Sequence, residues 1–240
     1  LSPAEAMVER VMKAVRQAGH LAVAPNRQAA AKAALGRIAY PTTRDERWKY
    51  TRASRLQKLN FHCADDQPVS APEILPGFDA HRLTFVNGRF QSGHSLAQEG
   101  VFIGPLSSAM TQCPEKVKAL ESDHFAENEW YAALQASAPQ DGGAILLDDN
   151  VTLERPILVH HHTTGGTTIA QPQHLMVLGR KSKAQVIVWT TCDNSATGLT
   201  NAAISADIGE HAHLAMEIVQ DEEGQAFHIG HHQFRQAASS

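Results

Sequence analysis

The sequence predicts an α+β protein with two regions, a mostly helical one over residues 1–140 with a small hairpin near 82–90, and a β region over residues 141–240. Two observations support this division. Apolar residues recur at helical spacing near the amino end, and from Ala144 onward short apolar segments alternate with Gly, Asp, Asn, Lys or Ser turns. Strands this short suit a sandwich, a barrel or a coiled parallel β-solenoid, and periodicity alone leaves all three open.

The amino end predicts two helices. Ser2-Pro3-Ala4-Glu5 has the pattern of a capping box with proline at the first helical position, and apolar residues then follow at helical spacing to about Gly19. A second, alanine-rich helix is expected between Pro25 and Ile38, because Tyr40-Pro41 ends the helical pattern.

The segment YPTTRDERWKYT, residues 40–51, predicts a short capped helix. Thr43 and Glu46 have capping-box spacing, and Trp48 and Tyr50 are amphipathic aromatic residues suited to anchor that helix on the β region.

Two further elements are expected before residue 140. Asn87-Gly88 favours a two-residue hairpin turn, because both positions tolerate positive φ. Residues 114–138 show helical spacing, with a break near Ser122-Asp123.

Composition argues against several functions. The net charge of -4 is small and the charges are interspersed, so no basic stripe suits nucleic acid. The apolar stretches fall far short of the roughly 20 residues that span a bilayer. The first helix is too charged for a secretion signal, so no membrane contact is expected and the cytoplasm is the expected compartment. Cys63, Cys113 and Cys192 are scattered, which indicates buried or half-buried thiols rather than disulfides or a thiolate metal site.

Three consecutive histidines, His160 to His162, raise the question of a metal site, because imidazole is a common ligand of zinc, copper and iron. Successive side chains of a strand alternate between its faces, so His160 and His162 share one face and His161 takes the other. Three ligands in a row cannot converge. The same reasoning pairs His228 with His232 and leaves His231 opposed.

A second histidine segment supports an alternative function. HAHLAMEIVQDEEG, residues 211–224, resembles part of the first cupin motif, in which two histidines and a glutamate bind a metal inside a β-barrel. This alternative is a cupin-like metal-dependent enzyme that uses His211, His213 and Glu217. Strand polarity separates the two folds, because a cupin pairs its strands antiparallel, whereas most of the strands expected here lack hairpin turns between them.

Four segments resemble the SufB/SufD family of iron-sulfur cluster assembly proteins. The segment at residues 40–51 matches a Pro-Thr-x-x-x-Glu-x-Trp-Lys-Tyr-Thr signature, and LTFVNGRF matches a family hairpin. The helix-to-strand passage ending in Arg155-Pro156-Ile157 and the segment DIGEHAHLAMEIVQ agree as well. The resemblance implies a right-handed parallel β-helix, with residues 155–166 as one rung, and places His160 to His162 near a strand end as ordinary polar edge residues.

The resemblance implies a scaffold subunit rather than an enzyme. Family members act with a SufB-like subunit and the ATPase SufC to build iron-sulfur clusters, and a homodimer is a further option. Family chains continue into more coils and a helical carboxyl-terminal domain that docks the ATPase and carries a histidine tied to cluster formation. We therefore expect a partial chain whose β-helix is incomplete at its carboxyl end, with no catalytic, cofactor-binding or metal-binding residue and no cofactor of its own.

Overall fold

The computed structural model describes residues 1–62, 70–93, 96–122, 128–222 and 225–240. Its helical part begins as predicted. Helix α1, Pro3–Ala18, starts with the capping box, because the Glu5 amide donates to Ser2 Oγ and the Ser2 amide donates to the Glu5 carboxylate. Helix α2, Pro25–Leu35, ends three residues before Ile38. No helix in the described part of the chain is long and apolar enough to cross a membrane.

The strands after residue 140 form a parallel β-solenoid of about three turns, as the resemblance implies. Two sheets stack these turns. The first, called here the β6 sheet, has the order β11-β9-β6-β1-β2, and the second, the β8 sheet, has the order β12-β10-β8-β5-β4-β3, with β7 beside β10. The bounds of the solenoid strands are β5 Gly143–Leu147, β6 Ile157–Thr163, β7 Ile169–Ala170, β8 Gln173–Leu178, β9 Lys183–Cys192, β10 Leu199–Ile208, β11 His213–Asp221 and β12 Phe227–Gln236.

The coils repeat at a nearly constant length. Ile157 of β6 lies opposite Val186 of β9, and Lys183 of β9 lies opposite His213 of β11, so neighbouring strands are about 30 residues apart in sequence. All of these pairs are parallel, as are β5–β8, β8–β10 and β10–β12. Crossovers between parallel strands of one sheet are right-handed in almost all proteins, which is the sense expected for this solenoid.

Strands from the first 140 residues extend both sheets. The predicted hairpin consists of β1, His81–Val86, and β2, Arg89–Gly93, and both residues of its Asn87-Gly88 turn have positive φ. β1 pairs in parallel with β6, so the hairpin continues the β6 sheet. β3, Leu96–Gln98, and β4, Val101–Pro105, were not expected from the sequence, and β4 pairs antiparallel with β5. The division of the chain into two regions at residue 140 stays a prediction.

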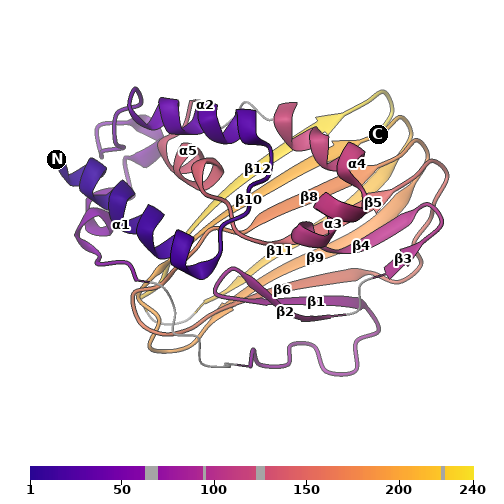
Figure 1. Cartoon of the computed structure of the whole chain (residues 1–240). Helices are drawn as coiled ribbons and strands as arrows, with labels where there is room; N and C mark the ends of the chain where they lie inside the picture. The colour runs from indigo at the N-terminus through magenta and orange to yellow at the C-terminus, as the bar shows by residue number, and fades with distance from the viewer. Residues whose placement is uncertain (63–69, 94–95, 123–127, 223–224) are drawn as a thin grey trace.

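The helices cover one sheet (Figure 1). Helix α5, Trp130–Ser137, contacts β10, helix α3, Leu106–Gln112, contacts β5 and β8, and α1 contacts β7. The stretch predicted to be helical over residues 114–138 contains α4, Pro114–Val117, which passes into the 3-10 helix η3, Lys118–Ser122, and then α5. The expected break at Ser122-Asp123 falls where the described residues stop.

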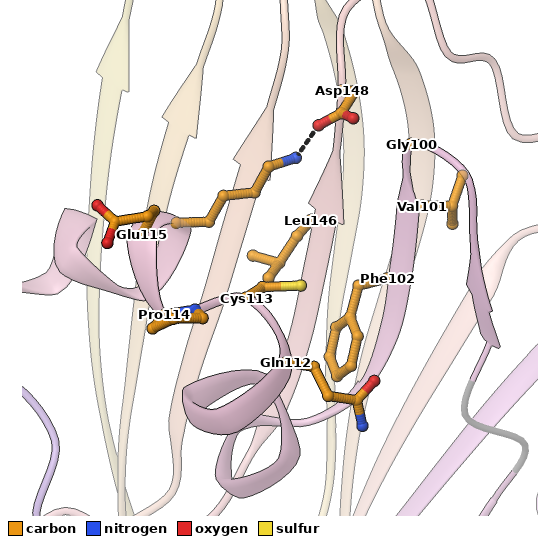
Figure 2. A pocket seen from close by; sticks show the side chains of 10 residues that line it. Gly100, Val101, Phe102, Gln112, Cys113, Pro114, Glu115, Leu146 and Asp148 are labelled. Atoms are coloured by element: carbon orange, nitrogen blue, oxygen red, sulfur yellow. Dashed lines mark hydrogen bonds and ion pairs between the residues drawn. The ribbon is translucent and has the colours of Figure 1, made fainter.

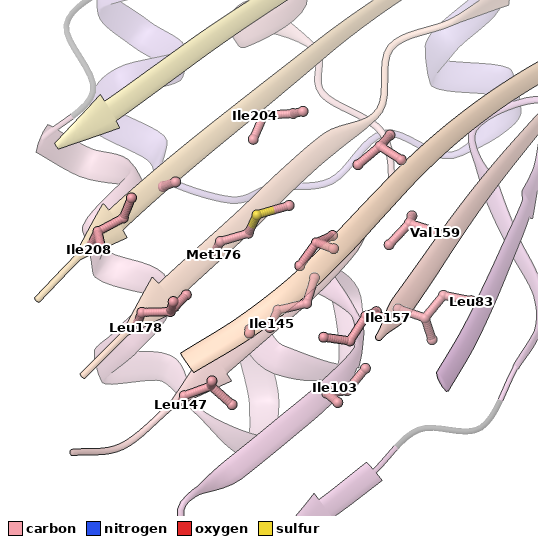
Figure 3. Packing of buried hydrophobic residues seen from close by; sticks show 14 of the residues in the cluster. Leu83, Ile103, Ile145, Leu147, Ile157, Val159, Met176, Leu178, Ile204 and Ile208 are labelled. Atoms are coloured by element: carbon pink, nitrogen blue, oxygen red, sulfur yellow. The ribbon is translucent and has the colours of Figure 1, made fainter. Parts of the chain in front are cut away.

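The main core fills the space between the two sheets (Figure 3). Val159 and Ile157 of β6 and Leu83 of β1 face Ile145 of β5 and Met176 of β8, and all five side chains are fully buried. Ile157 and Val159 point inward as expected for one rung of the solenoid. Each such side chain contributes about 1.5–3 kcal/mol by leaving water, so the inward rows hold the sheets together.

A cluster of aromatic residues joins the helical part to the solenoid, because Tyr131 of α5 packs in one core with Ile169 of β7 and Leu199 of β10. The Tyr40 hydroxyl donates to the Ala53 carbonyl at 2.6 Å, so the Tyr131 hydroxyl donates to Tyr40 at 2.5 Å. Trp48 packs on Tyr131 with ring centroids 5.2 Å apart. Trp48 is therefore a half-buried anchor, as predicted, although the ring on which it packs belongs to α5 rather than to the β region. The same prediction for Tyr50 is wrong, because this side chain is 91% exposed.

The capping box predicted at Thr43 is also not formed. The segment contains one 3-10 helix, η1, Glu46–Trp48, and a second, η2, Ala53–Lys58, follows it. The Asp45 carboxylate accepts a hydrogen bond from the Thr42 amide at 2.7 Å, so Asp45 rather than Thr43 organises the turn that precedes η1.

Replacing Trp48 by alanine is expected to cost roughly 2 kcal/mol in unfolding free energy, less than the about 3–5 kcal/mol typical of a fully buried Trp. The half-buried ring loses only part of its contact area and its packing on Tyr131. Urea unfolding measures the loss. Tyr50→Ala, at an exposed position in the same segment, should shift the unfolding free energy by less than about 0.5 kcal/mol. Equal losses in the two variants would contradict this assignment.

Candidate functional site in the histidine-bearing strands

The three consecutive histidines lie inside the molecule. β6 is a central strand, with β1 on one side and β9 on the other. His160, His161 and His162 are 3%, 4% and 6% exposed. The expectation that they are ordinary polar edge residues is wrong, because β1 and β9 flank all three of them and residues 70–74 of the preceding loop line a pocket together with His160. The predicted alternation is confirmed, since His161 faces the core and the other two share the outer face.

On the inner face, His161 forms a pair with His174 of β8. His161 stacks on Phe85 with centroids 4.7 Å apart, and its ring meets His174 edge-on at 4.8 Å. Burial lowers the pKa of His161 well below its ordinary value, and it lowers the pKa of His174 to about 4. Both rings are therefore neutral at physiological pH.

The hydrogen bonding of His174 shows which nitrogen carries its proton. The Gly143 amide donates to His174 Nδ1 at 3.1 Å, so the proton of the neutral ring lies on Nε2. A metal at Nε2 would force that proton onto Nδ1, against the Gly143 N–H. His174 is thus unsuited to ligate a metal through Nε2, although this atom and His161 Nε2 both lack a hydrogen-bond partner in the described part of the chain.

On the outer face, one hydroxyl links the other two histidines. Thr191 Oγ1 of β9 lies 2.8 Å from His160 Nε2 and 2.8 Å from His162 Nδ1. A hydroxyl has a single proton and two acceptor lone pairs, so it donates to at most one of the two rings. When it donates to one ring, that ring carries its own proton on its other nitrogen and presents a donor, whereas the ring that donates to Thr191 presents an acceptor.

The residues of the cupin alternative do not converge. His211 is an exposed turn residue with φ 57°, while His213 and Glu217 lie on the exposed outer face of β11. Glu217 accepts from the Gln185 amide at 3.3 Å. β11 pairs in parallel with β9, whereas a cupin needs antiparallel pairs, so the alternative is wrong about the fold. No group of three or more His, Cys, Asp or Glu side chains within the described ranges could hold a metal ion.

The carboxyl-terminal histidines also follow the predicted alternation. His228 Nδ1 lies 2.8 Å from the Glu222 carboxylate, and an added Cβ at Gly230 would lie near the rings of both His228 and His232. His228 and His232 therefore share one face of β12. His231 takes the opposite face, where its Nε2 lies 3.1 Å from Asn201 Oδ1.

Cys113 lines a pocket of about 370 Å³ between β4, β5 and the α3–α4 junction (Figure 2). Its half-buried thiol lies near Leu146, and an ion pair between Lys116 and Asp148 crosses one edge of the pocket. Among the described lining residues no second thiol or imidazole accompanies it. Cys113 and Cys192 are half-buried thiols, as expected, and Cys63 lies outside the described residues.

Two family models match consecutive parts of the chain. The SufBD protein N-terminal region matches residues 8–159, and the SufBD core domain of the SUF system for FeS cluster assembly matches residues 160–240. The chain belongs to the SufBD family. The resemblance inferred from four short segments is thereby confirmed over nearly the whole sequence.

Two curated SufBD relatives are similar at modest identity. The iron-sulfur cluster assembly SufBD family protein slr0076 of Synechocystis is 27% identical over 229 residues, which cover 85% of this chain and 49% of the relative. The iron-sulfur cluster assembly protein SufD of Escherichia coli is 25% identical over 204 residues, which cover 82% of this chain and 46% of SufD. The chain thus spans about half the length of these relatives, and membership supports a role in iron-sulfur cluster assembly.

Proposed function

We propose that this chain is a scaffold subunit of an iron-sulfur cluster assembly complex of the SufBCD type, acting in the cytoplasm with a SufB-like subunit and a SufC-like ATPase. The observation that carries the proposal is the match to both SufBD family models, which together extend from residue 8 to residue 240. The similarity to the E. coli protein named SufD favours the SufD position in such a complex.

The proposed role contains no chemical step by a residue of this chain. Clusters and iron are cargo of the complex in this proposal, and ATP hydrolysis belongs to the SufC-like subunit. The histidines of β6 accordingly have no catalytic role in it.

The proposal is tested by expressing the complete gene product that contains this chain together with the SufB-like and SufC-like proteins of the same organism. We expect all three to co-purify through a tag on this chain, and mass photometry to report a complex that contains each of them. The chain alone should neither hydrolyse ATP nor hold iron, zinc or manganese at one ion per chain by elemental analysis. Failure to co-purify, with only a homodimer in mass photometry, would overturn the proposal. A stoichiometric metal lost in a His211→Ala, His213→Ala double variant would instead favour metal-dependent catalysis.

A further inference from the structure

A cavity of about 390 Å³ lies on the outer face of the β6 sheet. Residues 70–74 form one wall, and side chains of β1, β2 and β6 form the others. Its volume falls within the range of small-molecule sites, about 300–1,000 Å³. The cavity lies outside the aromatic cluster and the Cys113 pocket, and the scaffold role does not use it.

Arg82 of β1 supplies a fixed positive charge to this cavity. Its guanidinium donates to three backbone carbonyls, those of Ile74 at 2.8 Å, Leu75 at 2.7 Å and Phe78 at 3.0 Å. A guanidinium has five N–H donors, so two remain, and their directions are set by the three bonds already made. None of the carboxylates in the described residues forms an ion pair with Arg82, so its charge lacks a compensating anion there.

His160 supplies a second polar group, whose ring proton can lie on either nitrogen. Its Nε2 is bonded to Thr191, which leaves Nδ1 as the other polar atom of a ring that lines the cavity. When Thr191 donates to His160, the proton of the ring lies on Nδ1 and the ring becomes a donor. Burial, the neighbouring His162 and Arg82 lower the pKa of His160 to about 4, so the ring is neutral rather than a cation, and it donates from Nδ1 in the tautomer in which Thr191 donates to Nε2.

The remaining polar lining completes a donor-rich surface. Thr84, Gln91 and Ser92 bring two hydroxyls and an amide to the cavity. The acidic lining residue is Glu73, which is exposed and can point to water. A planar guanidinium surrounded by neutral donors is suited to carboxylate or phosphate oxygens, which it can bind through two parallel N–H bonds.

We propose that this cavity binds a small molecule through an oxyanion group, a carboxylate or a phosphate, with Arg82 as the charge partner and His160 as a second donor. Apolar contact from Leu158, Ala71, Pro72 and Ile74 would hold the rest of the molecule. This inference is independent of the proposed function, because the cavity and its donors are properties of this chain alone.

The test is isothermal titration of the whole chain at pH 7.5 with inorganic phosphate and, separately, with malonate, at constant ionic strength. We expect saturable binding of one probe with a Kd of about 1 mM or lower. The tighter probe identifies the oxyanion class. Arg82→Gln should weaken binding at least about tenfold, which corresponds to 1.4 kcal/mol.

Arg155 offers a matched control. It too donates to a backbone carbonyl beside this loop, that of Ala80, and pairs with Asp79, but it does not line the cavity. Arg155→Gln should bind the probe within about twofold of the parent chain. Because Arg82→Gln also removes three hydrogen bonds, a second variant, Ser92→Trp, fills the cavity from the exposed strand β2 and should abolish binding. Absence of saturable binding in the parent chain, or full binding in Ser92→Trp, would overturn the proposal.

Discussion

Replacement of Gly198 by alanine is expected to destabilise the solenoid by more than about 4 kcal/mol. A Cβ at this position would overlap the backbone carbonyl oxygen of Thr168 in the preceding coil, and it would lie 2.8 Å from the Thr168 carbonyl carbon and amide nitrogen. The backbone at this point cannot move away freely, because the Leu199 amide donates to Thr168 at 3.0 Å and the Phe227 amide donates to Gly198 at 2.8 Å. The substitution therefore separates coils that backbone hydrogen bonds hold together.

Urea unfolding followed by circular dichroism measures this effect. Gly36→Ala is the matched control, since its Cβ would meet only the Ala33 carbonyl at an ordinary 3.6 Å. This control should change the unfolding free energy by less than about 1 kcal/mol. Alanine reduces the conformational freedom of the unfolded chain, which favours the folded state. An unfolding midpoint for Gly198→Ala equal to that of the parent chain would show that the coils can separate locally without cost.

Acidification from pH 7 to pH 4 is expected to cost roughly 3 kcal/mol of unfolding free energy for His174 alone. Its ring is completely buried, and burial lowers its pKa from 6.5 in the unfolded chain to about 4 in the folded one. Between these two pH values the unfolded chain binds the proton and the folded chain does not, so stability falls as pH falls. Above about pH 6.5 this ring is neutral in both the folded and the unfolded chain, so it no longer makes the unfolding free energy depend on pH.

Urea unfolding at pH 7.5, 6 and 5 in His174→Asn isolates this contribution. The asparagine side chain keeps an acceptor near the position of Nδ1 for the Gly143 amide, although it leaves a small cavity, so stability at pH 7.5 should be lower. The loss between pH 7.5 and 5 should nevertheless be smaller than in the parent chain. His213→Asn, at an exposed position, controls for the change of residue type. An equally steep loss in His174→Asn would refute the role of this ring.

Local sequence patterns predicted the elements and the direction of side chains well. The capping box at Ser2 and the turn at Asn87-Gly88 are confirmed because their determinants lie within a few residues of one another. The parallel solenoid followed from the family resemblance, since short apolar strands alone do not state which partner each strand pairs with. The alternation of His160, His161 and His162 follows from strand geometry and is likewise confirmed.

Burial was predicted less well, because it depends on what covers a face. The outer face of β6 is enclosed partly by residues 70–74, which belong to no helix or strand and have no periodic pattern. Tyr50 and Trp48 are both amphipathic aromatic residues of one segment, but the 3-10 helix ends at Trp48 and leaves Tyr50 in solvent.

The candidate oxyanion site could not be found from the sequence. Arg82 is one arginine among several in the chain, and its fixed orientation comes from carbonyls four, seven and eight residues earlier in an irregular segment. His160 reaches the same cavity only because β6 pairs with β1 across a long separation in sequence. Both facts depend on tertiary pairing rather than on any local motif.

The nearly constant spacing between paired strands limits how this chain can change in length. Each strand of the solenoid is hydrogen-bonded to the one about 30 residues later, and the inward and outward positions match from coil to coil. Inserting or duplicating one whole coil would leave every such match intact. A single residue added within a strand would instead move every later side chain of that strand to the opposite face of the sheet. Evolutionary gain or loss of length should therefore occur either in steps of one coil or at the turns between strands.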